Sequence, residues 1–449
     1  MASTKITRTS SASSEKKLTI SYWLKRSSTG EESVIGNTND GSNWAMFYFN
    51  GANKLQFASY IGGSYVMRYT TNRTFSDVGA WYHLVATVDV SLSTPEVKIY
   101  VNGEEQTSLQ YNTTPSQNAD IGWFNAWNFE IGVQFGSSYY LNGCLADLYY
   151  IQGYIHPAST FGETDATTGQ WKPKTSPTIN YGGNGGNSCH LKFENSANMD
   201  LDSGDNNLSL TTTGTITQTL DNPSNNFATL NVLQPSSSVL TITNGNTHIY
   251  SQSPNSWTTT PTTLAIPPTS KIYWEIKCIG VWGSSFCQLH GIVNLDNISQ
   301  EANNVQASDS SDCYGWKNDG SFKNNGSTVS NTSWASSYTT NDILMFALDN
   351  SNGALYVGKN GSWLNSGDPT SGASKTGALP VTAGLTYAPH SETKYGSDKP
   401  AYNFGNGVFV STAITTNSGN GYAGAEGKSK FNYQPPTGYS ALTTLGMNE

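Results

Sequence analysis

The chain has 449 residues, enough for two or three domains with separate hydrophobic cores. Only 12% of the residues are charged, whereas 44 Gly, 25 Tyr and 12 Trp give a composition typical of short strands and turns. The formal net charge of −9 excludes the basic surface expected of a nucleic-acid-binding protein. No apolar run is long enough to span a membrane, so no membrane insertion is expected.

The first 17 residues, MASTKITRTSSASSEKK, lack the apolar centre of a signal peptide. The composition nevertheless resembles that of extracellular proteins. Two interpretations reconcile these features: a viral structural protein that is made in the host cytoplasm and released by lysis, or a lectin released by a non-classical route. The first needs fewer assumptions.

Five cysteines are scattered along the chain in an odd number and without a C-x-x-C pair. This pattern argues against a zinc site or a dense disulfide framework. We expect reduced cysteines in the cores, at Cys144, Cys189, Cys278, Cys287 and Cys313.

The strongest structural signal lies between residues 81 and 105, WYHLVATVDVSLSTPEVKIYVNGEE. Apolar side chains alternate with polar ones at residues 82–88 and again at 97–101. This alternation predicts antiparallel strands with one buried and one solvated face. Asn102 and Gly103 then predict a tight hairpin turn.

Five segments of the first 150 residues together resemble laminin-G-like domains of the concanavalin A-like class. They are LTISYWLKR at 18–26, WYHLVATVD at 81–89, VKIYVNG at 97–103, FEIG at 129–132 and GCLADLYY at 143–150. The resemblance implies a jelly-roll sandwich. It says little about activity, because one fold hosts many functions.

The first domain is predicted over residues 1–210 and includes an irregular belt at 155–189. The belt is rich in Thr, Pro and Gly, and the alternating segment HLKF that follows at 190–193 is expected to return to the first sandwich. Residues 211–230 are predicted as a connecting segment. The sequence DNPSNNFATLN at 221–231 resembles a junction in tailed-phage structural proteins, where a laminin-G-like module meets a second β domain.

Residues 231–449 resemble SPRY-type (B30.2-like) sandwiches. The resemblance is carried by IYWEIK at 272–277, GIV at 291–293, YGWKNDG at 314–320, NDILMFALD at 341–349 and GALYVGKNG at 353–361. The predicted fold class is therefore all-β, with two tandem β-sandwich or jelly-roll domains and an irregular connecting segment.

Enzymatic motifs are missing from the sequence. Jelly-roll glucanases carry an E-x-D-x-x-E strand, whereas Glu130 and Glu194 have no acidic residue at the required spacing. There is no G-x-S-x-G or H-E-x-x-H motif, and His83 is interpreted as a strand residue whose ring is hydrogen-bonded. We expect a protein that is not an enzyme.

Glycan binding is the more natural activity for this composition, because sugars stack on exposed aromatic rings and present hydroxyls to amides. Residues 123–128, WFNAWN, are the first candidate stretch. The predicted glycan or partner contacts are Trp123, Asn125, Trp127, Trp44, Tyr139 and Tyr140. The alternative is that these rings pack a core or a subunit contact.

Calcium is the one cofactor considered, since clustered loop oxygens suit a hard cation. Asp200, Asp202 and Asp205 form the candidate site, and Asn39-Asp40-Gly41 offers a second group of oxygens. The alternative interpretation is Asx turns, in which the side chains bond their own backbone.

The predicted role is a structural protein on the exterior of a tailed phage particle, as a capsid decoration, fibre knob or tail-associated adhesin. Its expected partners are other virion proteins (capsid or tail subunits) and host cell-surface polysaccharide. A homo-oligomer is expected, with a trimer suggested by analogy only. A soluble carbohydrate-binding lectin and a polysaccharide-degrading tailspike are the alternatives.

Overall fold

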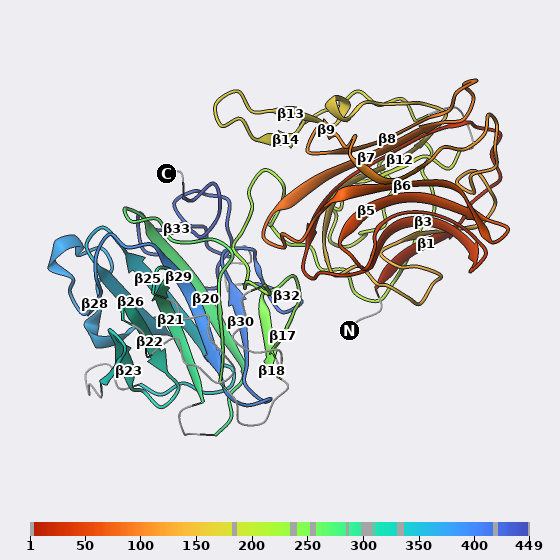
Figure 1. Ribbon diagram of the computed structural model, residues 1–449. Helices are drawn as coiled ribbons and strands as arrows, with labels where there is room; N and C mark the ends of the chain where they lie inside the picture. Colours follow the sequence, from red (N-terminus) through yellow and green to blue (C-terminus); the bar gives the residue numbers. More distant parts are fainter. Residues whose placement is uncertain are drawn as a thin grey trace. The chain divides into compact units, whose positions relative to one another are not determined.

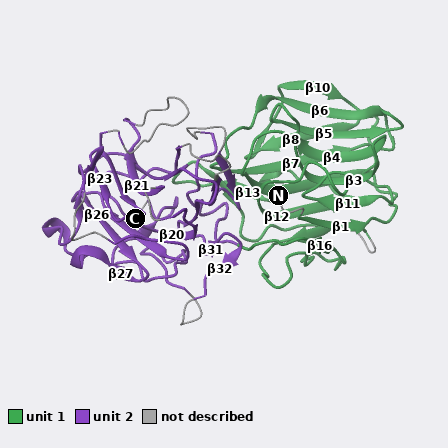
Figure 2. Ribbon diagram, turned by 90° about the horizontal axis from the view of Figure 1, so that it is seen from below, with its two compact units in different colours: residues 1–218 green, residues 219–449 purple. Residues whose placement is uncertain are grey.

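The fold is described from a computed structural model that covers residues 4–181, 186–233, 240–251, 257–283, 287–297, 309, 311–329, 336–415 and 421–447. The chain divides into unit 1, Met1–Gln218, and unit 2, Thr219–Glu449 (Figure 2). Within the described residues the regular structure is β-sheet with a few short 3-10 turns, which confirms the predicted all-β fold class.

Unit 1 is a sandwich of two antiparallel sheets (Figure 1). The eight-stranded sheet has the order β10 (Leu109–Thr113), β6 (Ser64–Thr74), β5 (Lys54–Ile61), β4 (Asn43–Phe49), β3 (Glu32–Asp40), β11 (Asn128–Ile131), β1 (Lys5–Thr9) and β16 (Thr211–Thr213). The six-stranded sheet has the order β15 (Cys189–Leu191), β12 (Gly143–Gln152), β2 (Lys17–Arg26), β7 (Trp81–Asp89), β8 (Glu96–Val101) and β9 (Glu104–Glu105).

The core of unit 1 lies between these sheets. The alternating side chains of β7 and β8 point into it, as predicted, and Tyr22 of β2 contacts Phe47 of β4 with ring centroids 5.5 Å apart. Asn102 and Gly103 make the predicted turn between β8 and β9, with φ of 50° and 83°. A left-handed backbone suits these two residue types.

The prediction of one solvated face on β7 is wrong, because every residue of this strand is buried. Residues 154–181 cover its outer face and include η1 (Ala158–Thr160), β13 (Gly162–Thr164) and β14 (Trp171–Pro173). Phe161 and Trp171 pack there against Val85 and Tyr149. The belt therefore contributes a second, smaller core on the outside of the six-stranded sheet.

His83 of β7 is the polar centre of this outer core. Its Nε2 is 2.9 Å from the Ser21 Oγ, and its Nδ1 accepts the Trp171 Nε1–H at 2.9 Å. Burial lowers the pKa of His83 to about 3. The ring is therefore neutral at pH 7 and hydrogen-bonded, in agreement with the expected structural role.

Unit 2 is a second sandwich of two large sheets. In the described residues one sheet runs β17 (Leu240–Thr243), β18 (His248–Ser251), β30 (Lys399–Asn403), β20 (Lys271–Gly280), β25 (Ile343–Asp349), β26 (Ala354–Lys359) and β27 (Ser362–Trp363), with β28 (Leu379–Pro380) beside β26 and β33 (Ser440–Ala441) beside β20. The other runs β19 (Thr258–Pro261), β29 (Tyr387–Thr393), β21 (Gln288–Asn294), β22 (Cys313–Lys317), β23 (Phe322–Asn324) and β24 (Ser327–Val329). The short elements are β31 (Val408–Phe409), β32 (Thr412–Ala413), η3 (Leu364–Ser366) and η4 (Gly372–Ser374).

The segment predicted as a connection, 211–230, is largely built into the two units. Its start forms β16, which pairs with β1 of unit 1. Its end enters unit 2, where Phe227 and Leu230 are fully buried and the Ala228 N–H donates to the Leu442 carbonyl oxygen. Burial of the apolar side chains at 227–230 is favourable, because it removes apolar surface from water. The free connection is therefore shorter than the predicted segment.

All five cysteines are reduced, and four of them are buried. No helix in the described parts of the chain is long and apolar enough to cross a membrane.

Candidate functional site

One row of side chains crosses the outer face of the eight-stranded sheet of unit 1. The strand register pairs Asn128 with Thr38, Thr38 with Trp44, Trp44 with Tyr60, and Tyr60 with Tyr65. Residues opposite each other on antiparallel strands point to the same face. The alternate residues of β4 point to the core, so this row lies on the outside of the sandwich.

The rings of this row support one another. Trp44 and Tyr60 are stacked with centroids 5.4 Å apart and an interplanar angle of 20°. Tyr65 meets both rings edge-on, at 4.9 Å from Tyr60 and 5.8 Å from Trp44. Trp44 is 8% exposed and Tyr65 36% exposed. Trp44 therefore supports the other two rings from below the surface, and Tyr65 is the ring that a ligand can reach. Stacking of this kind fixes the orientation of the rings.

Arg68 of β6 extends this surface toward the sheet edge. Its guanidinium lies over the Tyr65 ring at 4.5 Å and over the Tyr111 ring at 3.7 Å. Tyr111, on the edge strand β10, is 40% exposed. Two accessible rings thus hold a cation between them through cation–π contacts, which keeps the guanidinium donors close to both faces. We call Tyr60, Tyr65, Arg68 and Tyr111 the aromatic face.

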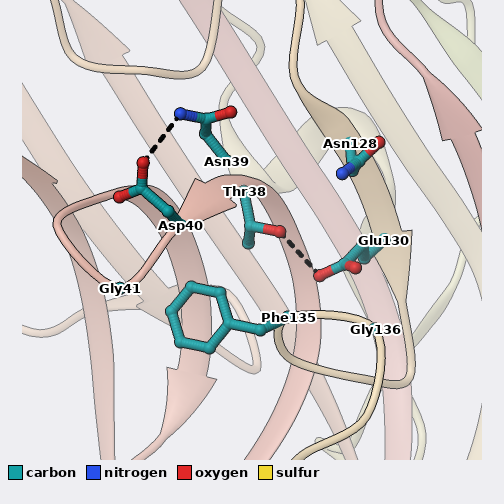
Figure 3. Close-up of a pocket in the computed structure, with 8 residues that line it drawn as sticks. All are labelled: Thr38, Asn39, Asp40, Gly41, Asn128, Glu130, Phe135 and Gly136. Atoms are coloured by element: carbon teal, nitrogen blue, oxygen red, sulfur yellow. Dashed lines mark hydrogen bonds between the residues drawn. The ribbon is translucent and has the colours of Figure 1, made fainter.

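A pocket of about 190 Å³ opens beside this row (Figure 3). Phe135 links the two features, because it lines the pocket and packs against the cluster that contains Trp44. The lining residues are Thr38, Asn39, Asp40, Gly41, Asn128, Glu130, Phe135 and Gly136.

Two carboxylates line the pocket, and both are engaged by neighbouring groups. Glu130 accepts the Thr38 hydroxyl at 2.8 Å, and burial raises the pKa of its carboxyl above the ordinary value. Asp40 accepts the Ser42 N–H at 2.8 Å and the Asn39 amide at 2.9 Å. In the view of Figure 3, Thr38 lies between these two acids. Asn39 and Asn128 add exposed amides, so the pocket is suited to hydrogen bonding with hydroxyl groups.

The structure corrects the prediction for Trp123, whose side chain is fully buried. It lies in the core of unit 1 between Phe57 and Tyr150, at centroid distances of 5.7 and 6.0 Å. The stretch WFNAWN turns sharply at its start, and the turn directs its first ring inward. Trp123 therefore cannot make an external contact.

The other predicted contacts have different surroundings. Trp127 is half-buried and packs closely against Gly122. The Asn125 amide donates to the Asp120 carboxylate at 3.0 and 3.1 Å, which holds the turn. Trp44 is buried below Tyr60, so its part in the site is indirect.

Tyr139 and Tyr140 lie on the loop between β11 and β12. Tyr139 is 50% exposed, and its carbonyl oxygen accepts the Ser33 N–H of β3. The Tyr140 hydroxyl donates to the Gly136 carbonyl oxygen at 3.3 Å. Since Gly136 lines the pocket, Tyr140 borders the site that the structure defines.

Two of the three aspartates predicted to bind calcium act as backbone acceptors. Asp202 accepts the N–H groups of His190, Gly204 and Leu208, and Asp200 accepts the Thr212 N–H at 2.7 Å. Asp205 is exposed. Across the described residues no group of three or more His, Cys, Asp or Glu side chains is placed to hold a metal ion. The turn interpretation therefore describes Asp202, which accepts the Gly204 N–H two residues on, whereas Asp200 accepts a backbone group twelve residues away.

Sequence reasoning missed Tyr60, Tyr65, Arg68 and Tyr111. A signal existed for two of them, since Tyr60 and Tyr65 flank the Gly62-Gly63 turn that joins β5 to β6. Arg68 and Tyr111 lie 43 residues apart in the sequence and meet only through the pairing of β6 with β10.

Comparisons with known proteins agree with the fold of unit 1. Residues 2–158 match a family model described as the concanavalin A-like lectin/glucanases superfamily. A search of curated proteins found no match.

Solved structures show weak similarity. Domains LG4-5 of the mouse laminin α1 chain are 9% identical, covering 89% of this chain and 85% of that chain with a TM-score of 0.30. The SPRY domain of human HERC1 is 14% identical, covering 38% of this chain and 96% of that chain with a TM-score of 0.29. A SAP-like pentraxin from Limulus polyphemus is 16% identical, covering 35% of this chain and 74% of that chain with a TM-score of 0.27. The family match over residues 2–158 confirms the concanavalin A-like fold predicted for the first part of the chain.

Proposed function

We propose that unit 1 binds a carbohydrate on the outer face of its eight-stranded sheet. The supporting observation is the aromatic face, in which exposed Tyr65 and Tyr111 enclose Arg68 on the sheet that also carries the polar pocket. Sugar rings present C–H faces that pack on aromatic rings, while their hydroxyls need polar partners.

In this proposal the binding is passive. The sheet register fixes the rings, and Trp44 stacked behind Tyr60 limits their movement. A sugar chain placed along the row would stack on Tyr65 and Tyr111, with hydroxyls reaching the Arg68 guanidinium. The amides of Asn39 and Asn128 lie several strands farther along the row, so an oligosaccharide that follows the row would reach them with a more distant sugar residue. A rigid site of this kind loses little conformational entropy on binding.

The test is affinity electrophoresis of the full chain on a panel of immobilised bacterial polysaccharides. Each aromatic contact contributes about 0.5–1.5 kcal/mol, so the double variant Tyr65→Ala/Tyr111→Ala should bind about tenfold more weakly. Tyr154→Ala is the matched control, because Tyr154 is 42% exposed on the same unit and lies outside the aromatic face. Equal retardation of the double variant and the wild type would contradict the proposal.

Glycoside hydrolysis is the second candidate, favoured by the two carboxylates of the pocket. Such enzymes need two carboxyl groups free to act on the scissile bond. Because Thr38 engages Glu130 and neighbouring side chains engage Asp40, we propose binding without hydrolysis. New reducing ends that appear with the wild type and disappear with Glu130→Gln would instead assign hydrolysis.

We also propose that the chain is a structural protein on the exterior of a tailed phage particle. The support is the resemblance of residues 221–231 to junctions in such proteins. Its partners would be capsid or tail subunits and further copies of itself, and its glycan would belong to the host surface. Mass spectrometry of purified particles tests this role, and absence of the chain from them would favour a cellular lectin.

A further inference from the structure

Unit 2 presents an aromatic pair in which one ring, at the end of β20, is exposed. Trp282 follows this strand and is 47% exposed. Its ring lies against Tyr395, which follows β29, with centroids 4.0 Å apart and an interplanar angle of 32°. One face of the indole is thus backed by a second ring while much of its surface remains accessible.

A buried carboxylate fixes the two loops that carry this pair. Asp398, which is fully buried, accepts the backbone N–H of Trp282 at 3.0 Å and that of Tyr395 at 2.9 Å. It also accepts the Lys394 N–H at 3.2 Å and the Gln288 side-chain amide at 3.1 Å. Charge-assisted hydrogen bonds of this kind are strong. The aromatic pair is therefore held in place by the protein before any ligand arrives.

Two lysines lie next to the pair. The Lys394 ammonium is 5.4 Å from the Tyr395 ring and 5.6 Å from the Trp257 ring. The Lys399 ammonium lies 4.5 Å from the ring of Tyr250, which is 40% exposed. β30 lies between β18 and β20, and the register places Lys399 opposite Gly280, two residues before Trp282. Lys394 therefore contacts one ring of the pair directly, and strand pairing brings the backbone of Lys399 next to the strand end that leads to Trp282.

The charge of this edge differs from that of the chain. The net charge is −9, yet neither Lys394 nor Lys399 forms an ion pair with any residue that the structure describes. Their ammonium groups lie over aromatic rings instead. No carboxylate in the described part of the protein pairs with these two cations. They can therefore pair with the carboxylate of a ligand.

We propose that Trp282, Tyr395, Lys394 and Lys399 form a second binding site that takes an anionic saccharide containing uronic acid. The pyranose ring would stack on the free face of Trp282, and its carboxylate would pair with Lys394 or Lys399. Nucleic acid fits less well, because its dense phosphates would meet repulsion from an acidic chain that offers two cations here.

Calorimetric titration of the full chain with oligogalacturonate, alginate oligosaccharide and heparin oligosaccharide tests the site. Trp282→Ala and the double variant Lys394→Gln/Lys399→Gln should each bind about tenfold more weakly, and Trp282→Phe should retain more affinity than Trp282→Ala. Methyl esterification of oligogalacturonate, which removes the charge, should weaken binding about as much. Lys428→Gln, at an exposed lysine of unit 2, is the matched control and should bind as the wild type.

Three results would overturn the proposal: no heat with any of the three saccharides, equal affinity of wild type and Trp282→Ala, or tighter binding of a single-stranded oligonucleotide than of the saccharides. Tyr65→Ala/Tyr111→Ala separates this site from that of unit 1. The double variant should leave these titrations unchanged, and loss of the heat would assign it to unit 1.

Discussion

The pH dependence of unit 1 stability follows from the buried His83. Its ring is enclosed by Trp23 and Trp171, at centroid distances of 4.6 and 6.0 Å, and its Nδ1 accepts the Trp171 N–H. Protonation would place a second N–H against that donor and a charge in an apolar core. The folded pKa is therefore lowered from 6.5 to about 3.

The sign and size of the effect follow from proton linkage. Between pH 6.5 and 3 the unfolded chain binds a proton that the folded chain does not, so stability falls as the pH falls. One pKa unit corresponds to about 1.4 kcal/mol, which gives a loss of about 3 kcal/mol between pH 6.5 and 4. This contribution is fully present above pH 6.5.

Urea unfolding monitored by hydrogen exchange in peptides from β7 measures this loss. The wild type should lose about 1.4 kcal/mol per pH unit more than His83→Gln between pH 6 and 4, because glutamine does not titrate. Peptides from β25 of unit 2 provide the internal control and should show the same pH dependence in both proteins. Identical slopes for β7 in the two proteins would refute the assignment of His83 as a buried neutral base.

Three further predictions concern Glu275, Gly103 and Asp202. Burial raises the pKa of Glu275 to about 7, so its contribution to folding stability is fully present below pH 4.5 and is lost as the pH rises through 7. Glu275→Gln should therefore remove about 3 kcal/mol of pH dependence from the free energy of unfolding of unit 2 in urea. An unchanged pH profile in this variant would contradict the assignment. In Gly103→Ala the new Cβ would lie 2.6 Å from the Trp171 ring, whereas in Gly62→Ala the new Cβ has open space at a similarly positive φ. Gly103→Ala should therefore lower the melting temperature several degrees more than Gly62→Ala. Equal shifts would argue against the packing of Trp171 of the belt on this turn. Asp202→Ala should lower the free energy of unfolding by about 1–3 kcal/mol, because three backbone N–H groups lose their acceptor. Calcium and EDTA should leave the melting temperature of the wild type unchanged. A calcium-dependent shift would support the metal hypothesis.

The segment that joins the two units shows a limit of prediction from the local sequence pattern. Residues 211–230 are polar and turn-rich, which predicts a connecting segment. Phe227 and Leu230 are nevertheless fully buried, because partners distant in the sequence, such as Leu442 and Thr443, complete the core around them. No window of the sequence around residue 227 contains those partners.

The candidate site was accessible to sequence reasoning only in part. Tyr140 borders the pocket, and Trp44 is stacked against Tyr60 of the aromatic face, so part of the predicted region is close to the site. Trp123 and Trp127 looked equivalent in WFNAWN, yet the first is fully buried and the second only half-buried. The direction of each ring depends on the turn that precedes it and on the sheet it meets.

The sequence by itself determined that the chain is all-β, where its principal strands lie, and that the outline of unit 1 is concanavalin A-like. These properties follow from period-two alternation and turn residues, which act over a few neighbours. Only the tertiary structure decided which faces are covered and which rings remain accessible. Cross-strand register brings Tyr65, Arg68 and Tyr111 together, and the belt buries the outer face of β7. Both outcomes depend on contacts between residues far apart in the chain, where side-chain volume and hydrogen bonding select among many pairings that the local pattern allows equally.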